Sequence, residues 1–171
     1  MKKNNNTNPM AGVLAITRKT VAYANAFPET FRPGTKSYAW YEQMSGICTV
    51  GLDHFTDMES ARPLLEIMEL FAQTDRPEAK ALYGAYLNQT DKPWYNPLVG
   101  KIMLMHAIDE VKEDNPQAPY VMYVYAMHVL TGKGWFHRDE ACARRWFRRS
   151  SELGCVEAGL MLRAMERKRT A

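Results

Sequence analysis

The fold of this chain is decided by residues 118–162, which read APYVMYVYAMHVLTGKGWFHRDEACARRWFRRSSELGCVEAGLML. The stretch opens on a small residue, Ala118, which is followed by apolar and aromatic side chains. A similar pattern begins at Ala79 and again at Ala158, so it recurs about every forty residues. Self-similarity at this period is typical of one supersecondary unit that is repeated and stacked, as in an α-solenoid. Such proteins usually bind other macromolecules, which makes binding the first hypothesis for function.

The small, glycine and aromatic residues of this stretch also match a known motif. The matching positions are Ala118, Gly132, Gly134, Asp139, Ala143, Trp146, Phe147, Arg149, Ser150, Ser151, Gly154 and Ala158. In type and spacing they resemble the SEL-like repeat family, a relative of the tetratricopeptide repeat whose unit pairs two antiparallel helices. The stretch has one extra residue between Gly134 and Asp139, and it has Ser150-Ser151 in place of a small alanine pair. The resemblance implies a short α-solenoid.

A weaker unit covers residues 79–117. The positions that fit the motif there are Leu82, Gly84, Ala85, Tyr86 and Ala107. A longer turn with prolines, Thr90–Pro97, replaces the Gly-x-Gly of the motif, and no match precedes residue 56. We therefore predict an all-α protein with a disordered tail at 1–9 and a single helical domain at 10–171. Within that domain, residues 10–55 form N-terminal capping helices and residues 56–171 form about two helix-pair repeats.

Capping residues, prolines and glycines place the helices along the chain. The expected helices span residues 10–25, 38–48, 56–73, 77–88, 97–113, 119–130, 139–153 and 156–168. The expected N-caps are Thr56 (in a capping box with Glu59), Asp75, Asn96 and Asp139. The Tyr and Val content of Val121–Val129 also suits a strand, but a helix is favoured because the equivalent residues of the neighbouring units are helical.

Apolar residues three and four positions apart predict which side chains face the core. The predicted inward residues are Val13, Ile16, Thr17 and Val21, then Trp40, Met44 and Ile47, then Leu64, Leu65, Met68 and Phe71. Trp146 and Leu153 form a further stripe seven residues apart. Trp146 is either a core aromatic or a binding aromatic, and the core is favoured.

Length and composition fit one soluble globular domain. The chain has 171 residues, of which 46% are hydrophobic and 24% charged, and a net charge of +3. An odd cysteine count (three) suggests reduced thiols and a cytoplasmic location. Secretion is less favoured, because the short apolar run at 10–16 is followed at once by Arg18 and Lys19. No stretch approaches the ~20 apolar residues that span a bilayer, so membrane insertion is not expected.

The residues that often do chemistry are present but are not arranged in a recognisable site. The candidates are His54, His106, His128, His137, Cys48, Cys142 and Cys155. They show no His-x3-His or Cys-x2-Cys spacing, and Gly132-x-Gly134 is too short for a phosphate-binding loop. We therefore predict no catalytic, cofactor-binding or metal-binding residues and no enzyme activity.

Two surfaces are candidates for binding. The first helix of each unit in such solenoids tends to line the concave side, and here it presents the residues Tyr83, Tyr86, Met122, Tyr123 and His128. The second candidate is the basic helix 139–153, which has the residues Arg144, Arg145, Arg148 and Arg149, followed by Arg163, Arg167, Lys168 and Arg169. This basic face is either a solvated surface, which is favoured, or a site for an acidic protein or a nucleic acid.

The function expected from these features is a non-catalytic protein–protein interaction module. An adaptor or scaffold, a regulatory subunit, a secretion-system accessory or an inhibitor of a toxin or enzyme would all fit. The alternative is a nucleic-acid-associated regulator that uses the basic helix. Since a stable stack usually needs three or more repeats, either the N-terminal helices or a second copy in a homodimer must cover an exposed face.

Overall fold

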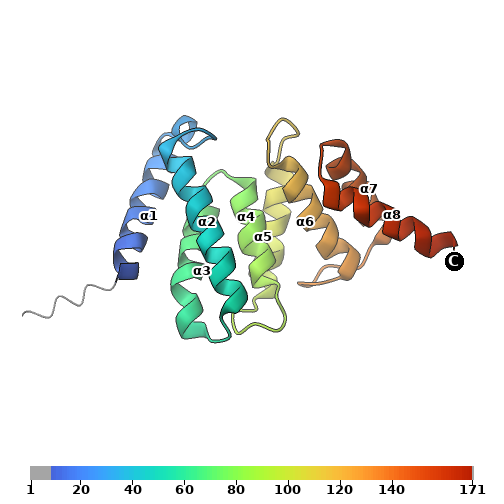
Figure 1. Ribbon diagram of the computed structural model, residues 1–171, viewed down its shortest axis with the longest axis horizontal. Helices are drawn as coiled ribbons and strands as arrows, with labels where there is room; N and C mark the ends of the chain where they lie inside the picture. The colour runs from blue at the N-terminus through green and yellow to red at the C-terminus, as the bar shows by residue number, and fades with distance from the viewer. Residues whose placement is uncertain (1–8, 171) are drawn as a thin grey trace, which may run out of the picture. The chain divides into compact units, whose positions relative to one another are not determined.

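The described part of the chain is all-helical, which confirms the predicted class. A computed structural model describes residues 9–170, with side chains for residues 10–167 (Figure 1). Its elements are α1 (Pro9–Ala26), a short 3-10 helix η1 (Pro28–Thr30), α2 (Lys36–His54), α3 (Met58–Ala72), α4 (Pro77–Leu87), α5 (Pro97–Glu110), α6 (Ala118–Thr131), α7 (Glu140–Glu152) and α8 (Val156–Thr170). Residues 9–170 contain no strand, so Val121–Val129 is helical as favoured. The predicted tail lies outside the described residues, except for Pro9, where α1 begins.

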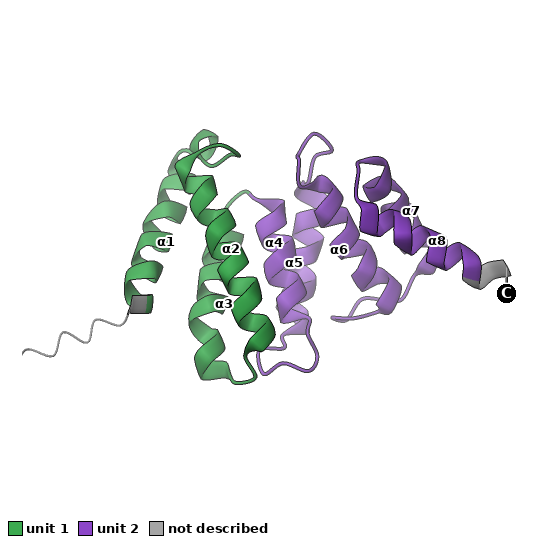
Figure 2. Ribbon diagram, in the orientation of Figure 1, with its two compact units in different colours: residues 1–75 green, residues 76–171 purple. Residues whose placement is uncertain are grey.

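The chain divides into two compact units, residues 1–75 and residues 76–171 (Figure 2). The first unit holds α1, η1, α2 and α3, and the second holds α4 to α8. The predicted division into 10–55 and 56–171 placed α3 with the repeats, whereas this helix packs against α1 and α2. The single domain over 10–171 stays a prediction.

An aromatic cluster forms the core of the first unit. Phe31, which follows η1, lies 5.9 Å from the rings of both Tyr38 and Tyr41, and the ring of Phe71 in α3 is 5.1 Å from that of Tyr41. Burial of aromatic rings in such contacts is worth about 0.5–1.5 kcal/mol per pair beyond the area buried. This cluster therefore joins α2 and α3 through a loop residue that helical spacing cannot identify.

The predicted inward faces of α1 and α2 were partly wrong. Ile16 is 51% exposed and Ile47 is 50% exposed, and Trp40 is only half-buried. The buried residues of α2 are Tyr38, Tyr41, Met44, Cys48 and Leu52. The helix is rotated so that its tyrosines meet Phe31 and Phe71, and this rotation turns Ile47 to the outside. In α3, the predicted inward residues are all buried.

Most helix ends follow their predicted local signals. The side chain of Asn96 accepts a hydrogen bond from the Val99 N–H (3.2 Å), and Asp139 accepts one from the Cys142 N–H (2.8 Å). Gly132 ends α6 in the left-handed region, with a φ of 71°. Two caps were wrong by one residue. Asp57 rather than Thr56 caps α3, and Arg76 rather than Asp75 holds the N-cap position of α4, where it makes no side-chain cap bond.

Small residues set the packing of the second unit, in which α4 packs against α5, α6 against α7, and α7 against α8. The four small motif residues that are fully buried are Ala118, Ala143, Ser150 and Ala158. The Ser150 hydroxyl donates to the Pro119 carbonyl oxygen at 2.7 Å, which ties α7 to the start of α6. Trp146 is half-buried and meets the edge of Tyr125 at 5.7 Å, so it packs at the border of the core.

Candidate interaction surfaces

The five residues expected on a concave face do not form an exposed surface. Met122 is buried, as are Tyr83 and Tyr86, each with 8% exposure, and only Tyr123 and His128 are half-buried. Tyr123 lies 5.9 Å from the ring of the fully buried Phe147, so it packs onto the core between α6 and α7. These residues therefore pack within the folded chain, and they do not form a tyrosine surface for a partner.

His128 lies in a half-buried position under the turn that follows α6. Its Nδ1 is 2.9 Å from the Val124 carbonyl oxygen, and its ring is 5.9 Å from the Phe136 ring. Burial lowers the pKa of His128 below its ordinary value of about 6.5, and the nearby charge of Lys133 lowers the pKa further. The folded chain therefore favours the neutral form of the His128 imidazole.

We expect this burial to make the stability of the chain depend on pH. The pKa of His128 is lower in the folded chain than in the unfolded chain, so the unfolded chain binds the proton more readily. The free energy of unfolding therefore decreases as the pH falls from about 6.5 towards the folded pKa, and it does not respond to His128 above that range. Urea unfolding of His128→Gln and wild type from pH 8 to pH 5 measures this effect. The free energy of unfolding of wild type should fall relative to that of the variant towards low pH, and parallel curves would contradict the assignment.

The basic face of α7 is partly neutralised by carboxylates. Arg144 pairs with Glu140 at 3.1 Å, one turn earlier. Arg149 pairs with Glu152 at 3.1 Å and also with Glu113, whose Oε1 accepts from the Arg149 Nε at 2.6 Å. This pairing lowers the pKa of the Glu113 carboxyl. The bond from Arg149 links α7 to the segment between α5 and α6 and gives this arginine a role within the fold.

Two of the four arginines remain open to solvent. Arg145 and Arg148 are exposed, and neither forms an ion pair within the described side chains, residues 10–167. Of the other basic residues, Arg163 and Arg167 are exposed on α8, while Lys168 and Arg169 lie beyond the described side chains. The structure thus brings together a smaller positive patch than the sequence predicted.

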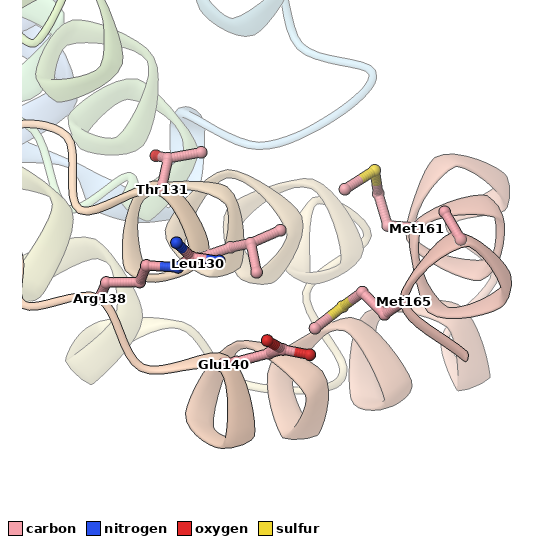
Figure 3. A pocket seen from close by; sticks show the side chains of 7 residues that line it. Leu130, Thr131, Arg138, Glu140, Met161 and Met165 are labelled. Atoms are coloured by element: carbon pink, nitrogen blue, oxygen red, sulfur yellow. The ribbon is translucent and has the colours of Figure 1, made fainter. Parts of the chain in front are cut away.

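A cavity of about 360 Å³ opens between α6 and α8 (Figure 3). Its residues are Leu130, Thr131, Arg138, Glu140, Met161, Ala164 and Met165. Leu130, Met161 and Met165 supply apolar contact area, while Arg138 and Glu140 give it a charged edge (Figure 3). Sequence reasoning did not identify this cavity, although the two methionines four residues apart were a usable signal, since methionine suits adaptable contact surfaces.

In the part of the chain described by the structure, no three His, Cys, Asp or Glu side chains are placed to bind a metal ion. Burial raises the pKa of the Cys48 thiol to about 12, which leaves it protonated and a poor nucleophile at neutral pH. Among the described helices, none is both long enough and apolar enough to cross a membrane.

No protein-family model matches the chain, and no curated protein and no solved structure matches it either. The resemblance to SEL-like repeats therefore rests on the sequence of residues 118–162 alone.

Proposed function

We propose that this protein is a non-catalytic protein–protein interaction module built from helix pairs of the SEL-like type. The observation behind the proposal is the position of the motif residues within the second unit. Its small residues are fully buried between helices, Asp139 caps α7, and Gly132 and Gly134 reverse the chain with φ values of 71° and 63°. These are the roles that a helix-pair repeat needs from such residues. Repeats of this kind present surface for binding rather than groups for chemistry.

The proposal is tested on the full-length chain in its own cell. We expect the tagged chain, expressed at its natural level and cross-linked before lysis, to migrate in a discrete complex with one other protein. The complex should survive nuclease treatment, because contacts between proteins hold it together. A chain that migrates only as a monomer or as a complex with itself would contradict the proposal.

A nucleic-acid regulator is the second candidate, and the exposed Arg145 and Arg148 are the observation that favours it. The same experiment separates the two candidates, because a complex that nuclease disperses would support this alternative. Titration of labelled DNA and RNA at 50 and 200 mM salt adds a second measurement, since phosphate contacts weaken steeply with salt. Arg145→Gln/Arg148→Gln should then reduce binding, whereas the matched pair Arg32→Gln/Lys36→Gln in the first unit should not.

A further inference from the structure

The cavity between α6 and α8 has an apolar wall (Figure 3). Leu130 comes from the end of α6, and Met161, Ala164 and Met165 come from α8. Both methionine side chains extend from α8 toward α6 (Figure 3). Methionine adapts to apolar ligands, because its side chain is unbranched and its sulfur is polarisable. This wall therefore suits the apolar part of a ligand.

The size of the cavity suits a small molecule. Its volume of about 360 Å³ lies at the lower end of the ~300–1,000 Å³ that is usual for ligand pockets. A protein–protein interface uses about 20–30 residues on each side, whereas seven residues line this cavity. The cavity can therefore hold a small ligand, but it is too small to be a protein interface by itself.

The charged residues at the edge of the cavity differ in their partners. Glu140 accepts a hydrogen bond from the Arg144 guanidinium at 3.1 Å. Asp139, which precedes it in the chain, accepts one from the Cys142 N–H at 2.8 Å. Arg138 is exposed and forms no ion pair within the described side chains, residues 10–167. Arg138 is therefore the charged lining residue that the fold leaves without a counter-ion.

The helices around the cavity carry an excess of positive charge. From the start of α6 to the end of the sequence, residues 118–171 contain ten Lys or Arg and five Asp or Glu. The connection before α6, residues 111–117, adds Lys112, Glu113 and Asp114, so the excess is almost unchanged. Such a charge distribution attracts an anionic ligand and repels a cationic one.

We propose that the cavity between α6 and α8 binds a small carboxylic acid with an apolar body, in its carboxylate form. The apolar body lies against Leu130, Met161 and Met165, and the carboxylate accepts hydrogen bonds from the Arg138 guanidinium. The Arg138 side chain reaches toward Leu130, so one ligand can contact both (Figure 3). A guanidinium presents its N–H donors in a planar fork that matches a carboxylate. Binding at this site goes beyond the proposed function and does not depend on it.

The test is a titration of the purified full-length chain with three ligands that share one apolar body: octanoate, octan-1-ol and octylammonium. The methyl groups of Met161 and Met165 report binding by ¹³C NMR, with their signals assigned from Met161→Leu and Met165→Leu. We expect octanoate to shift both signals and to bind at least about tenfold more tightly than octan-1-ol, because it adds a charge-assisted hydrogen bond. Octylammonium should bind more weakly than octanoate. Butanoate should bind at least about tenfold more weakly than octanoate, because it has four fewer methylenes to bury.

Variants of the lining residues separate binding from stability. Arg138→Gln should reduce the affinity for octanoate to that for octan-1-ol. Only the Cβ and the backbone of Arg138 pack near Gly132, and glutamine retains both, so the urea midpoint should not change. The matched control Arg145→Gln removes another exposed arginine without an ion pair within residues 10–167, and it should leave octanoate binding within about twofold. Ala164→Phe places a ring at the cavity and should abolish octanoate binding.

Four results would overturn the proposal. They are equal affinity for octanoate and octan-1-ol, tighter binding of octylammonium, octanoate binding by Arg138→Gln that equals wild type, and octanoate binding that leaves the Met161 and Met165 signals unshifted. Tighter binding of octylammonium would assign the cavity to Glu140 instead. The titration uses the purified chain without a partner protein. The proposed function therefore stands or falls on the complex in cells, whatever the titration shows.

Discussion

Replacing Gly84 by valine should destabilise the second unit by about 3 kcal/mol, because α4 and α5 touch at this residue. A Cβ at position 84 would lie 2.8 Å from the Gly100 carbonyl oxygen and 3.1 Å from side-chain atoms of Met103 and Leu104. The closest of these atoms belongs to a helix backbone, which cannot rotate away as a flexible side chain can. The two helices must therefore separate, and the packing around Leu104 is lost with them.

Gly46 offers a matched control for this substitution. It also lies inside a helix, α2, but a Cβ built there has no atom within 4 Å. Gly46→Val should leave stability unchanged or raise it by a few tenths of a kcal/mol, since valine has a better helix propensity than glycine. Urea unfolding followed by far-UV circular dichroism compares the two variants. If Gly84→Val were as stable as Gly46→Val, the close approach of α4 and α5 would be wrong.

Truncating Phe147 to alanine should cost about 3–5 kcal/mol. The side chain is fully buried between α6, α7 and α8, in a cluster with Val129, Ala158 and Met165. Its removal takes away both its transfer free energy and its contacts, and the surrounding helices can only partly fill the space. Because Met165 also lines the cavity between α6 and α8, the variant should loosen that cavity as well.

The control for this prediction is Phe27→Ala, which removes the same side chain from a position that is 48% exposed. Its cost should stay within about 0.5 kcal/mol, as is usual for surface substitutions. Unfolding midpoints in urea measure both variants, and hydrogen exchange along α8 reports the local loosening. A loss below about 1 kcal/mol for Phe147→Ala would mean that α7 does not pack as described.

The candidate sites were predicted less well than the helices. The tyrosines of α4 and α6 were expected on a surface, but helix sequence alone cannot show that neighbouring elements cover them. Arg144 and Arg149 were expected in a positive patch, but their partner carboxylates reduce it, and Glu113 lies 36 residues from Arg149 in the chain. The exposure of Trp135 (61%) was not predicted, although a large aromatic directly after Gly132-x-Gly134 indicates that a turn displays it.

The sequence by itself determined most helix starts and which small residues lie between the helices, although α2 runs to His54, six residues beyond its expected end. Asn96, Asp139 and Gly132 act on hydrogen bonds within four residues of themselves, so their effect is visible in the local sequence. Only the tertiary structure decided which faces are covered. The rotation of α2 follows from Phe31 and Phe71, and the outward position of Trp135 follows from the anchoring of its two neighbours to Asn88, Tyr125 and Lys101. Burial depends on residues that are distant in the chain, and no local pattern contains that information.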